Sequence, residues 1–264
     1  MKIKALKKII NGLLSYSDLR LVNNSSYQKI LESKKRLDSL GFCINYNESI
    51  IGQYCAKKSF SKSQLKQDLF VLCETDFKRN GFFVEFGATN GIDLSNTYLL
   101  EKEFGWQGIL AEPGRNWHEA LFKNRSCEIE TKCIYSSTGR NILFHEVDMP
   151  ELSTISEYSS QDYHSQFRRN TKEYRVKTLS LNDLLTIHQA PIEIDYISLD
   201  TEGSEYEILK GFDFSKYKIK VLTIEHNYTA SRELIYELMI SNGYHRVFQN
   251  YSMFDDWYVL KDLC

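Results

Sequence analysis

The fold is decided at residues 82–91, which read FFVEFGATNG. An apolar run ends there in an acid and a turn of small residues, and a helix is predicted to begin at residues 95–97, SNT. A strand that leads through a tight turn into a helix presents unpaired backbone N–H groups, which favour an anionic group. A second apolar run at 108–111 ends in Glu112, and an acid at that point binds the ribose hydroxyls of a nucleotide. The two features together predict a site for a ribose-bearing cofactor.

Composition and charge exclude several classes of protein. The chain has 264 residues, of which 42% are hydrophobic and 26% charged, as in a folded α/β domain with an extra segment. A net charge of −2 argues against a general nucleic-acid-binding protein, which would need a basic excess. The six cysteines form no Cys-x-x-Cys pair, so we expect reduced thiols and a cytoplasmic protein. No apolar run approaches the roughly 18 residues that span a bilayer, and we expect no transmembrane segment.

Strands and helices are predicted to alternate along most of the chain. The expected strands are 82–87, 108–112, 128–135, 141–147, 194–200, 219–225, 244–249 and 256–261, and the expected helices are 63–80, 95–104, 115–124, 204–211 and 231–241. This alternation predicts a mostly parallel sheet covered on both faces, with an antiparallel pair at the end, where no helix separates the strands. We assign residues 63–264 to this domain. Residues 1–62 carry helical spacing and no chemical motif, which indicates a helical N-terminal extension for packing, self-association or covering the site.

The stretch from residue 150 to 174 differs from the rest of the domain. It is rich in Ser, Tyr, Gln and Arg, contains His164, and shows little apolar periodicity. Long polar insertions in compact domains are often lids or binding loops, so this is a candidate substrate loop. A solvated surface loop is the alternative, and the sequence leaves both interpretations open.

Polar side chains follow two further predicted strands. Asp200 and Glu202 come after one strand, and Glu225-His226 ends the next. Because parallel strands end at one edge of a sheet, we expect these side chains to be neighbours beside the cofactor. Acids and an imidazole there form either a divalent metal site or a base with its orienting acid. The alternative is that the acids cap loops and the histidine is an ordinary surface residue.

Five motifs occur in a characteristic order along the chain. They are FVEFGATNG (83–91), SNTYLLEK (95–102), WQGILAEP (106–113), SLDTEGSEYEILKGF (198–212) and IEHN (224–227). This combination resembles the FkbM family of S-adenosylmethionine-dependent methyltransferases over roughly residues 63–260. The resemblance implies a class I methyltransferase fold, a Rossmann-like α/β fold whose seven-stranded, mostly parallel sheet ends in an antiparallel pair.

The resemblance also implies which residues would bind S-adenosyl-L-methionine. They are Glu85, Gly87, Ala88, Gly91, Ser95, Asn96, Glu112 and Pro113. Glu85 and the two glycines would line the methionine end, and Glu112 would bind the ribose. Thr89 departs from the family pattern, in which many relatives have Asn. Because the family mostly methylates hydroxyls of sugars and other secondary metabolites, we expect a small-molecule acceptor such as a nucleotide-activated sugar or a capsule or surface-glycan component.

Two mechanisms suit such an acceptor, whose hydroxyl must be activated at neutral pH. In the first, Asp200, Glu225 and His226 bind Mg²⁺ or Mn²⁺, which lowers the pKa of the hydroxyl. This set resembles the ligands of metal-dependent sugar O-methyltransferases. In the second, no metal is used, and His226 acts as general base oriented by Asp200 or Glu202.

Two other functions compete with methyl transfer. A nicotinamide-dependent sugar oxidoreductase would share the nucleotide site, and residues 206–210 supply its Tyr-x-x-x-Lys pattern. The same spacing recurs at 98–102 and 54–58, and the glycine spacing for a pyrophosphate is missing. A non-catalytic module that binds S-adenosylmethionine is the second competitor, and the intact set of Asp200, Glu225 and His226 argues against it.

Overall fold

The structure is a computed structural model that describes residues 42, 45–147, 153–158 and 171–261. The chain divides into two units, residues 1–47 and 48–264, and the elements described below belong to the second. Most of the expected N-terminal extension, and residues 150–152 and 159–170 of the candidate substrate loop, lie outside the described residues. In the part of the chain that the structure describes, no helix combines the length and the apolar character needed to cross a bilayer.

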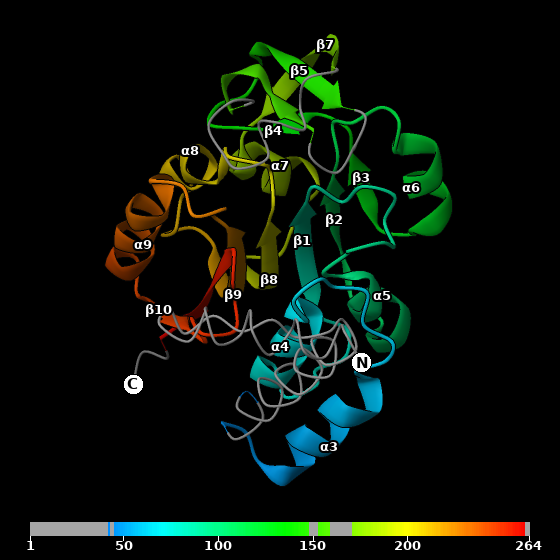
Figure 1. Ribbon diagram of the computed structural model, residues 1–264, viewed down its shortest axis with the longest axis vertical. Helices are drawn as coiled ribbons and strands as arrows, with labels where there is room; N and C mark the ends of the chain where they lie inside the picture. The colour runs from blue at the N-terminus through cyan, green and yellow to red at the C-terminus, as the bar shows by residue number, and fades with distance from the viewer. Residues whose placement is uncertain (1–41, 43–44, 148–152, 159–170, 262–264) are drawn as a thin grey trace, which may run out of the picture. The chain divides into compact units, whose positions relative to one another are not determined.

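The second unit is built on a seven-stranded sheet (Figure 1) in the order β10-β11-β9-β8-β1-β2-β3. Its strands are β1 (Phe82–Phe86), β2 (Gln107–Ala111), β3 (Glu128–Glu130), β8 (Glu193–Leu199), β9 (Lys218–Glu225), β10 (Tyr244–Val247) and β11 (Asp255–Leu260). The first five of these pair in parallel, whereas β11 runs antiparallel to both β9 and β10. The prediction of a mostly parallel class I methyltransferase sheet with an antiparallel C-terminal pair is therefore confirmed.

Helices cover both faces of this sheet. The helices of the unit are α3 (Glu48–Lys57), α4 (Gln67–Glu74), α5 (Tyr98–Phe104), α6 (His118–Asn124), α7 (Leu181–Ile187), α8 (Glu205–Lys210) and α9 (Ser231–Ser241). Of these, α3 packs on α4 and not on the sheet. On one face, apolar side chains of α7, α8 and α9 pack with Val84 and Ile197 in the main core. Side chains alternate along a strand, so Phe83 points to the opposite face. There α4 is buried, and its Phe70 ring stacks on Trp257 of β11 with centroids 4.5 Å apart.

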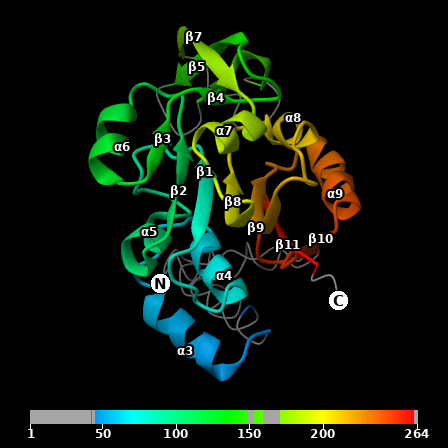
Figure 2. The same cartoon turned by 180° about the vertical axis from the view of Figure 1, so that it is seen from behind.

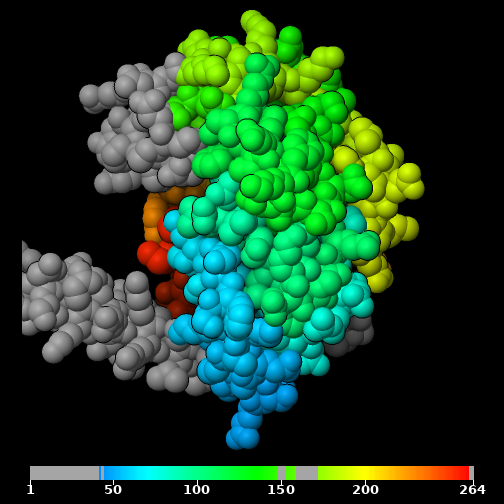
Figure 3. Space-filling view, turned by 90° about the vertical axis from the view of Figure 1, so that its right-hand side faces the viewer, coloured from blue at the N-terminus to red at the C-terminus, as the bar shows by residue number. Residues whose placement is uncertain are grey.

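A second sheet, in the order β4-β7-β5-β6, is inserted between β3 and β8. Its strands are β4 (Cys133–Ile134), β5 (Asn141–Val147), β6 (Thr154–Ile155) and β7 (Thr171–Leu179), with the short 3-10 helix η3 (Ser156–Tyr158) after β6. Seen from behind, it lies at the end of the main sheet to which β1 and β2 run (Figure 2). In the space-filling view, its green and yellow-green residues form one continuous surface with the rest of the unit (Figure 3).

The structure differs from the expected elements at several places. The expected strand 128–135 is two strands, β3 and β4, in different sheets. The elements β6, η3, β7 and α7 were not predicted. The expected helix 63–80 is confined to α4, because Asp76 and Phe77 take φ angles of 52° and 51°. A right-handed helix cannot continue through residues in that region. The Ser63 hydroxyl accepts the backbone N–H of Asp68 in the first turn of α4 (3.5 Å) and donates to the Gln67 side chain (2.7 Å).

Candidate functional site

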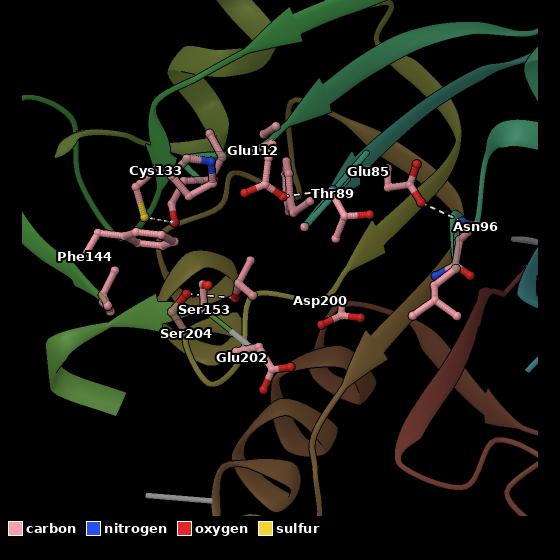
Figure 4. A pocket seen from close by; sticks show the side chains of 18 of the residues that line it. Glu85, Thr89, Asn96, Glu112, Cys133, Phe144, Ser153, Asp200, Glu202 and Ser204 are labelled. Atoms are coloured by element: carbon pink, nitrogen blue, oxygen red, sulfur yellow. Dashed lines mark hydrogen bonds between the residues drawn. The ribbon is translucent and has the colours of Figure 1, made fainter. Parts of the chain in front are cut away.

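A cavity opens where β1, β2 and β8 end, at one edge of the main sheet (Figure 4). It encloses about 880 Å³ of space, a figure that includes the part open to solvent. Five of the residues expected to bind the cofactor line it: Glu85, Gly87, Asn96, Glu112 and Pro113. The other three, Ala88, Gly91 and Ser95, are not among the lining residues. The cavity thus brings together both halves of the predicted cofactor site.

The turn after β1 depends on its glycines. Gly87 has a φ of 73°, and a Cβ atom there would overlap the carbonyl oxygen of Asp200. A residue with a side chain would therefore separate the β1 turn from the end of β8. Gly91 has a φ of 81°, and a Cβ atom there would lie 2.6 Å from Cγ of Arg125. The close approach of another backbone therefore requires glycine at position 87, and the positive φ and the neighbouring Arg125 side chain favour it at position 91.

Glu85 organises the start of α5. Its carboxylate accepts hydrogen bonds from the Ser95 hydroxyl (3.0 Å), the Asn96 backbone N–H (2.6 Å) and the Thr97 hydroxyl (2.5 Å). These donors precede the first turn of the helix, where backbone N–H groups lack helical partners. Glu85 therefore orders one wall of the cavity, and its carboxylate already accepts three hydrogen bonds.

Arg125, which follows α6, is a site residue that no sequence motif indicated. Its side chain is fully buried, and it donates to Glu101 (2.6 Å), to the Gly91 carbonyl oxygen (3.1 Å) and to the Thr97 hydroxyl (2.9 Å). It also lies 3.6 Å from the Glu85 carboxylate. A single arginine between a helix and a strand carries no recognisable pattern, so sequence reasoning had no signal for it.

Glu112 lies at the tip of β2, where the sequence predicted the ribose-binding acid. One carboxylate oxygen accepts the Thr89 N–H (2.9 Å) and the other accepts the Gly114 N–H (2.7 Å). Burial raises the pKa of Glu112 to about 7, in spite of these two donors. The carboxylate is thus held in one orientation at the wall of the cavity.

The two ends of the cavity differ in character. At one end, the Asn96 side-chain amide donates to the Ser198 hydroxyl (2.9 Å), while its buried Oδ1 has no partner among the described residues. At the other end, Phe144 and Ile155 of the second sheet contribute apolar surface, beyond Glu112 in Figure 4. A ligand that carries both a donor group and an apolar ring fits this division.

Three carboxylates meet beside the cavity. Asp200, Glu202 and Glu225 each offer an oxygen within 4.8 Å of the others. Burial raises the pKa of Asp200 and of Glu225, and the neighbouring charge of Asp200 raises that of Glu225 further. Oε2 of Glu225 is buried without a hydrogen-bond partner among the described residues. Such a group is stable only when protons or a cation reduce its charge.

The structure does not bring His226 into this group of acids. Its Nδ1 accepts the Tyr228 backbone N–H (2.9 Å), so in the neutral ring the proton is on Nε2, which lies 3.8 Å from Asp256. Burial lowers the pKa of His226, which favours the neutral ring. Neither nitrogen then has a free lone pair for a metal or a substrate. Of the predicted set Asp200, Glu225 and His226, the structure brings the two acids close to Glu202 and directs the histidine ring elsewhere.

A second cavity adjoins the same acids. Its lining includes Glu202, Glu225 and His226, together with the hydroxyl and amide side chains of Tyr158, Asn227, Thr229 and Ser231. Glu202 lines both cavities. The acids therefore stand between a cavity suited to a nucleoside and one lined with hydrogen-bonding side chains.

One protein family and several solved structures are similar to this chain. The model of the family described as "Methyltransferase FkbM domain" matches residues 85–259. No match was found among curated proteins. A precorrin-6y C5,15-methyltransferase from Geobacter metallireducens GS-15 is similar in structure, with 10% identity, a TM-score of 0.37, and 73% of this chain and 85% of that chain covered. A Pyrococcus horikoshii protein described as an RNA methyltransferase has 10% identity and a TM-score of 0.35, with 74% and 82% covered.

Proposed function

The chain belongs to the FkbM family of S-adenosylmethionine-dependent methyltransferases, and from this membership we propose that it methylates a hydroxyl group of a carbohydrate. The observation that carries the proposal is the group of acids Asp200, Glu202 and Glu225, which adjoins both the cofactor cavity and the second cavity. Membership of a methyltransferase family decides against the nicotinamide-dependent oxidoreductase.

The residues of the first cavity fit S-adenosylmethionine along its whole length. Glu112 would accept the ribose hydroxyls, as acids at the end of the second strand do in nucleotide-binding sheets. The unpartnered Oδ1 of Asn96 would accept the ammonium group of the methionine part. Phe144 and Ile155 would cover the adenine. The bound sulfonium supplies an activated methyl group, so the protein has to place the acceptor oxygen and help to remove its proton.

We assign the acceptor to the second cavity. Asn227, Thr229 and Ser231 offer amide and hydroxyl groups there, which suit the hydroxyls of a sugar or nucleotide-sugar. Glu202 and Glu225 line this cavity as well, so an acceptor inside it would lie next to the acids. This arrangement supports transfer from the first cavity to an oxygen held in the second.

Activation of the acceptor hydroxyl is proposed to use a divalent ion. Asp200, Glu202 and Glu225 would hold Mg²⁺ or Mn²⁺, which prefer carboxylate ligands, and the unpartnered oxygen of Glu225 fits such a role. A bound ion lowers the pKa of a coordinated hydroxyl. A second candidate mechanism without metal is favoured by the raised pKa of Asp200, because a carboxylate with a pKa near neutrality is a suitable general base.

Removal of divalent ions tests the proposal. After dialysis against EDTA, we expect formation of S-adenosylhomocysteine with a panel of sugars and nucleotide-activated sugars to stop, and added Mn²⁺ to restore it. Binding of S-adenosylmethionine, measured by calorimetry, should be unchanged by the same treatment, because Glu112 and Asn96 do not belong to the group of acids. Turnover that survives dialysis would favour Asp200 as the base, and turnover with no member of the panel would argue against a carbohydrate acceptor.

Replacement of Glu112 by glutamine tests the ribose site. The amide group of glutamine would face one of the two backbone N–H groups that now donate to the carboxylate. Together with the loss of charge, we expect S-adenosylmethionine to bind about tenfold to a hundredfold more weakly in calorimetry. Glu119→Gln, on the exposed side of α6, is the matched control and should bind as the unaltered protein does. Equal affinities for the two variants would contradict this assignment of Glu112.

A further inference from the structure

We propose that the second sheet positions both halves of the site, with Tyr174 and Thr154 as its positioning residues. Tyr174 fixes the loop after Glu112, and Thr154 fixes the loop that carries Glu202. The role of these loops in binding rests on the proposed function, whereas the contacts themselves do not. Two sets of contacts carry the proposal. One joins the second sheet to the loop after β2, and the other joins it to the loop after β8.

The first set joins β7 to the loop after β2. The Tyr174 hydroxyl accepts the Arg115 backbone N–H (3.0 Å) and donates to the Glu146 carboxylate (2.8 Å). The Arg115 guanidinium group lies over the Tyr174 ring, 4.2 Å from its centroid. One residue before Arg115, the Gly114 N–H donates to Glu112 (2.7 Å). A shift of this loop would therefore move a donor that orients the Glu112 carboxylate.

The second set joins β6 and η3 to the loop after β8. The buried Thr154 hydroxyl donates to the carbonyl oxygen of Glu202 (2.9 Å). Glu202 has a φ of 58°, a conformation that is costly for a residue with a side chain and needs support from its surroundings. Next to it, Gly203 has a φ of 121°, and a Cβ atom there would lie 2.9 Å from Cβ of Tyr158. The second sheet thus packs on the backbone that directs the Glu202 side chain.

The two sets are joined through one strand. Along β5, Phe144 pairs with Tyr174 of β7, and the next residue, His145, pairs with Thr154 of β6. Phe144 also lines the first cavity. Strand pairing through β5 therefore connects Tyr174, which holds the loop after Glu112, to Thr154, which holds the loop that carries Glu202. The second sheet therefore contacts and holds two loops, one after β2 and one after β8.

Hydrogen exchange of the whole chain, followed by mass spectrometry, tests whether the second sheet holds these two loops. In Tyr174→Phe, we expect the amides of residues 114–116 to exchange about three- to tenfold faster, because the Arg115 N–H loses its acceptor. S-adenosylmethionine should bind more weakly by a similar factor. In Thr154→Val, the amides of residues 201–204 should exchange faster and Mn²⁺ should bind more weakly. Each variant should leave the other loop unchanged.

Two control variants separate positioning from a general loss of stability. Thr154→Ser keeps the hydroxyl and should restore the exchange of residues 201–204, and Tyr206→Phe on α8 should alter neither loop. No change in either loop, or equal acceleration of both loops in both variants, would overturn the proposal. If the unaltered protein binds neither S-adenosylmethionine nor Mn²⁺, the proposed function fails, while the exchange pattern still decides whether Tyr174 and Thr154 support their loops.

Discussion

Replacement of Arg125 by methionine should lower the free energy of unfolding by about 3–5 kcal/mol, as for other buried ion pairs that lose one partner. The side chain of Arg125 is fully buried between Glu85 and Glu101, whose side chains are only 4% and 8% exposed. Methionine keeps most of the volume and removes the charge. Glu85 would then lack its cation, Glu101 would keep only its ion pair with Lys102 (2.6 Å), and the Gly91 carbonyl oxygen would lose its donor.

The same change should also prevent binding of S-adenosylmethionine. Arg125 contacts the Gly91 carbonyl oxygen and the Thr97 hydroxyl, so it holds both ends of the loop that forms one wall of the cavity. Urea denaturation followed by circular dichroism gives the loss of stability, and calorimetry gives the loss of binding. Arg79→Met is the matched control, since Arg79 is exposed, donates one hydrogen bond among the described residues, to the Glu103 carbonyl oxygen, and lies over the Phe104 ring. Equal stabilities of the two variants would show that the buried network contributes little.

The main sheet and the acids at its edge could be predicted because they follow from short-range patterns. Each apolar run is a strand buried on both faces, and parallel strands end at one edge. Once β1, β2, β8 and β9 are recognised, Glu112, Asp200 and Glu225 must come near each other. The glycine turn after β1 is equally local, because the backbone at Gly87 approaches that of Asp200.

The orientation of the His226 side chain could not be predicted from such patterns. Its position after β9 was predicted, but the direction of its ring depends on the next two residues. Asn227 and Tyr228 have φ angles of 43° and 56°, and the resulting turn brings the Tyr228 N–H onto Nδ1. Glu202 reaches the group of acids through a similar turn, with a φ of 58°. Positive φ angles at residues other than glycine are not evident from sequence patterns.

The second sheet was not predicted as a sheet, although its strand β5 was expected at 141–147, and the reason is a different one. Its longest pairing joins residues 141–147 to 171–177, across a polar segment that indicated a loop. Pairing at such a separation depends on the tertiary core of Cys133, Phe144 and Val176, and not on local periodicity. Arg125 belongs to the same category, because its partners come from three separate segments of the chain. The sequence therefore predicts the residues at the edge of the main sheet, but it does not predict the part of the cavity lining that the second sheet supplies.

Replacement of Asp200 by asparagine should reduce methyl transfer by about a hundredfold to ten-thousandfold while S-adenosylmethionine still binds. Asparagine keeps the shape of the side chain but removes its negative charge. The side chain can then neither bind a divalent ion strongly nor take the proton of the acceptor hydroxyl. Single-turnover formation of S-adenosylhomocysteine measures the transfer, and calorimetry measures the binding. Asp76→Asn, at an exposed position with a φ of 52° that asparagine tolerates, is the matched control. Transfer at an unchanged rate would remove Asp200 from the mechanism.

The stability of Asp200→Asn distinguishes a lost function from a lost fold. Burial raises the pKa of Asp200 above its ordinary value of 3.8, so folding favours the protonated acid. Its contribution to stability is then fully present below pH 3.8 and is lost as the pH rises through the higher pKa of the folded protein. Asparagine does not ionise and also relieves Glu225 of a neighbouring charge. Without divalent ions, the variant should therefore be more stable than the unaltered protein at about pH 8, with a smaller difference in acid. A variant that is more stable and binds its cofactor, yet does not transfer the methyl group, can only have lost the chemistry that the carboxylate performs.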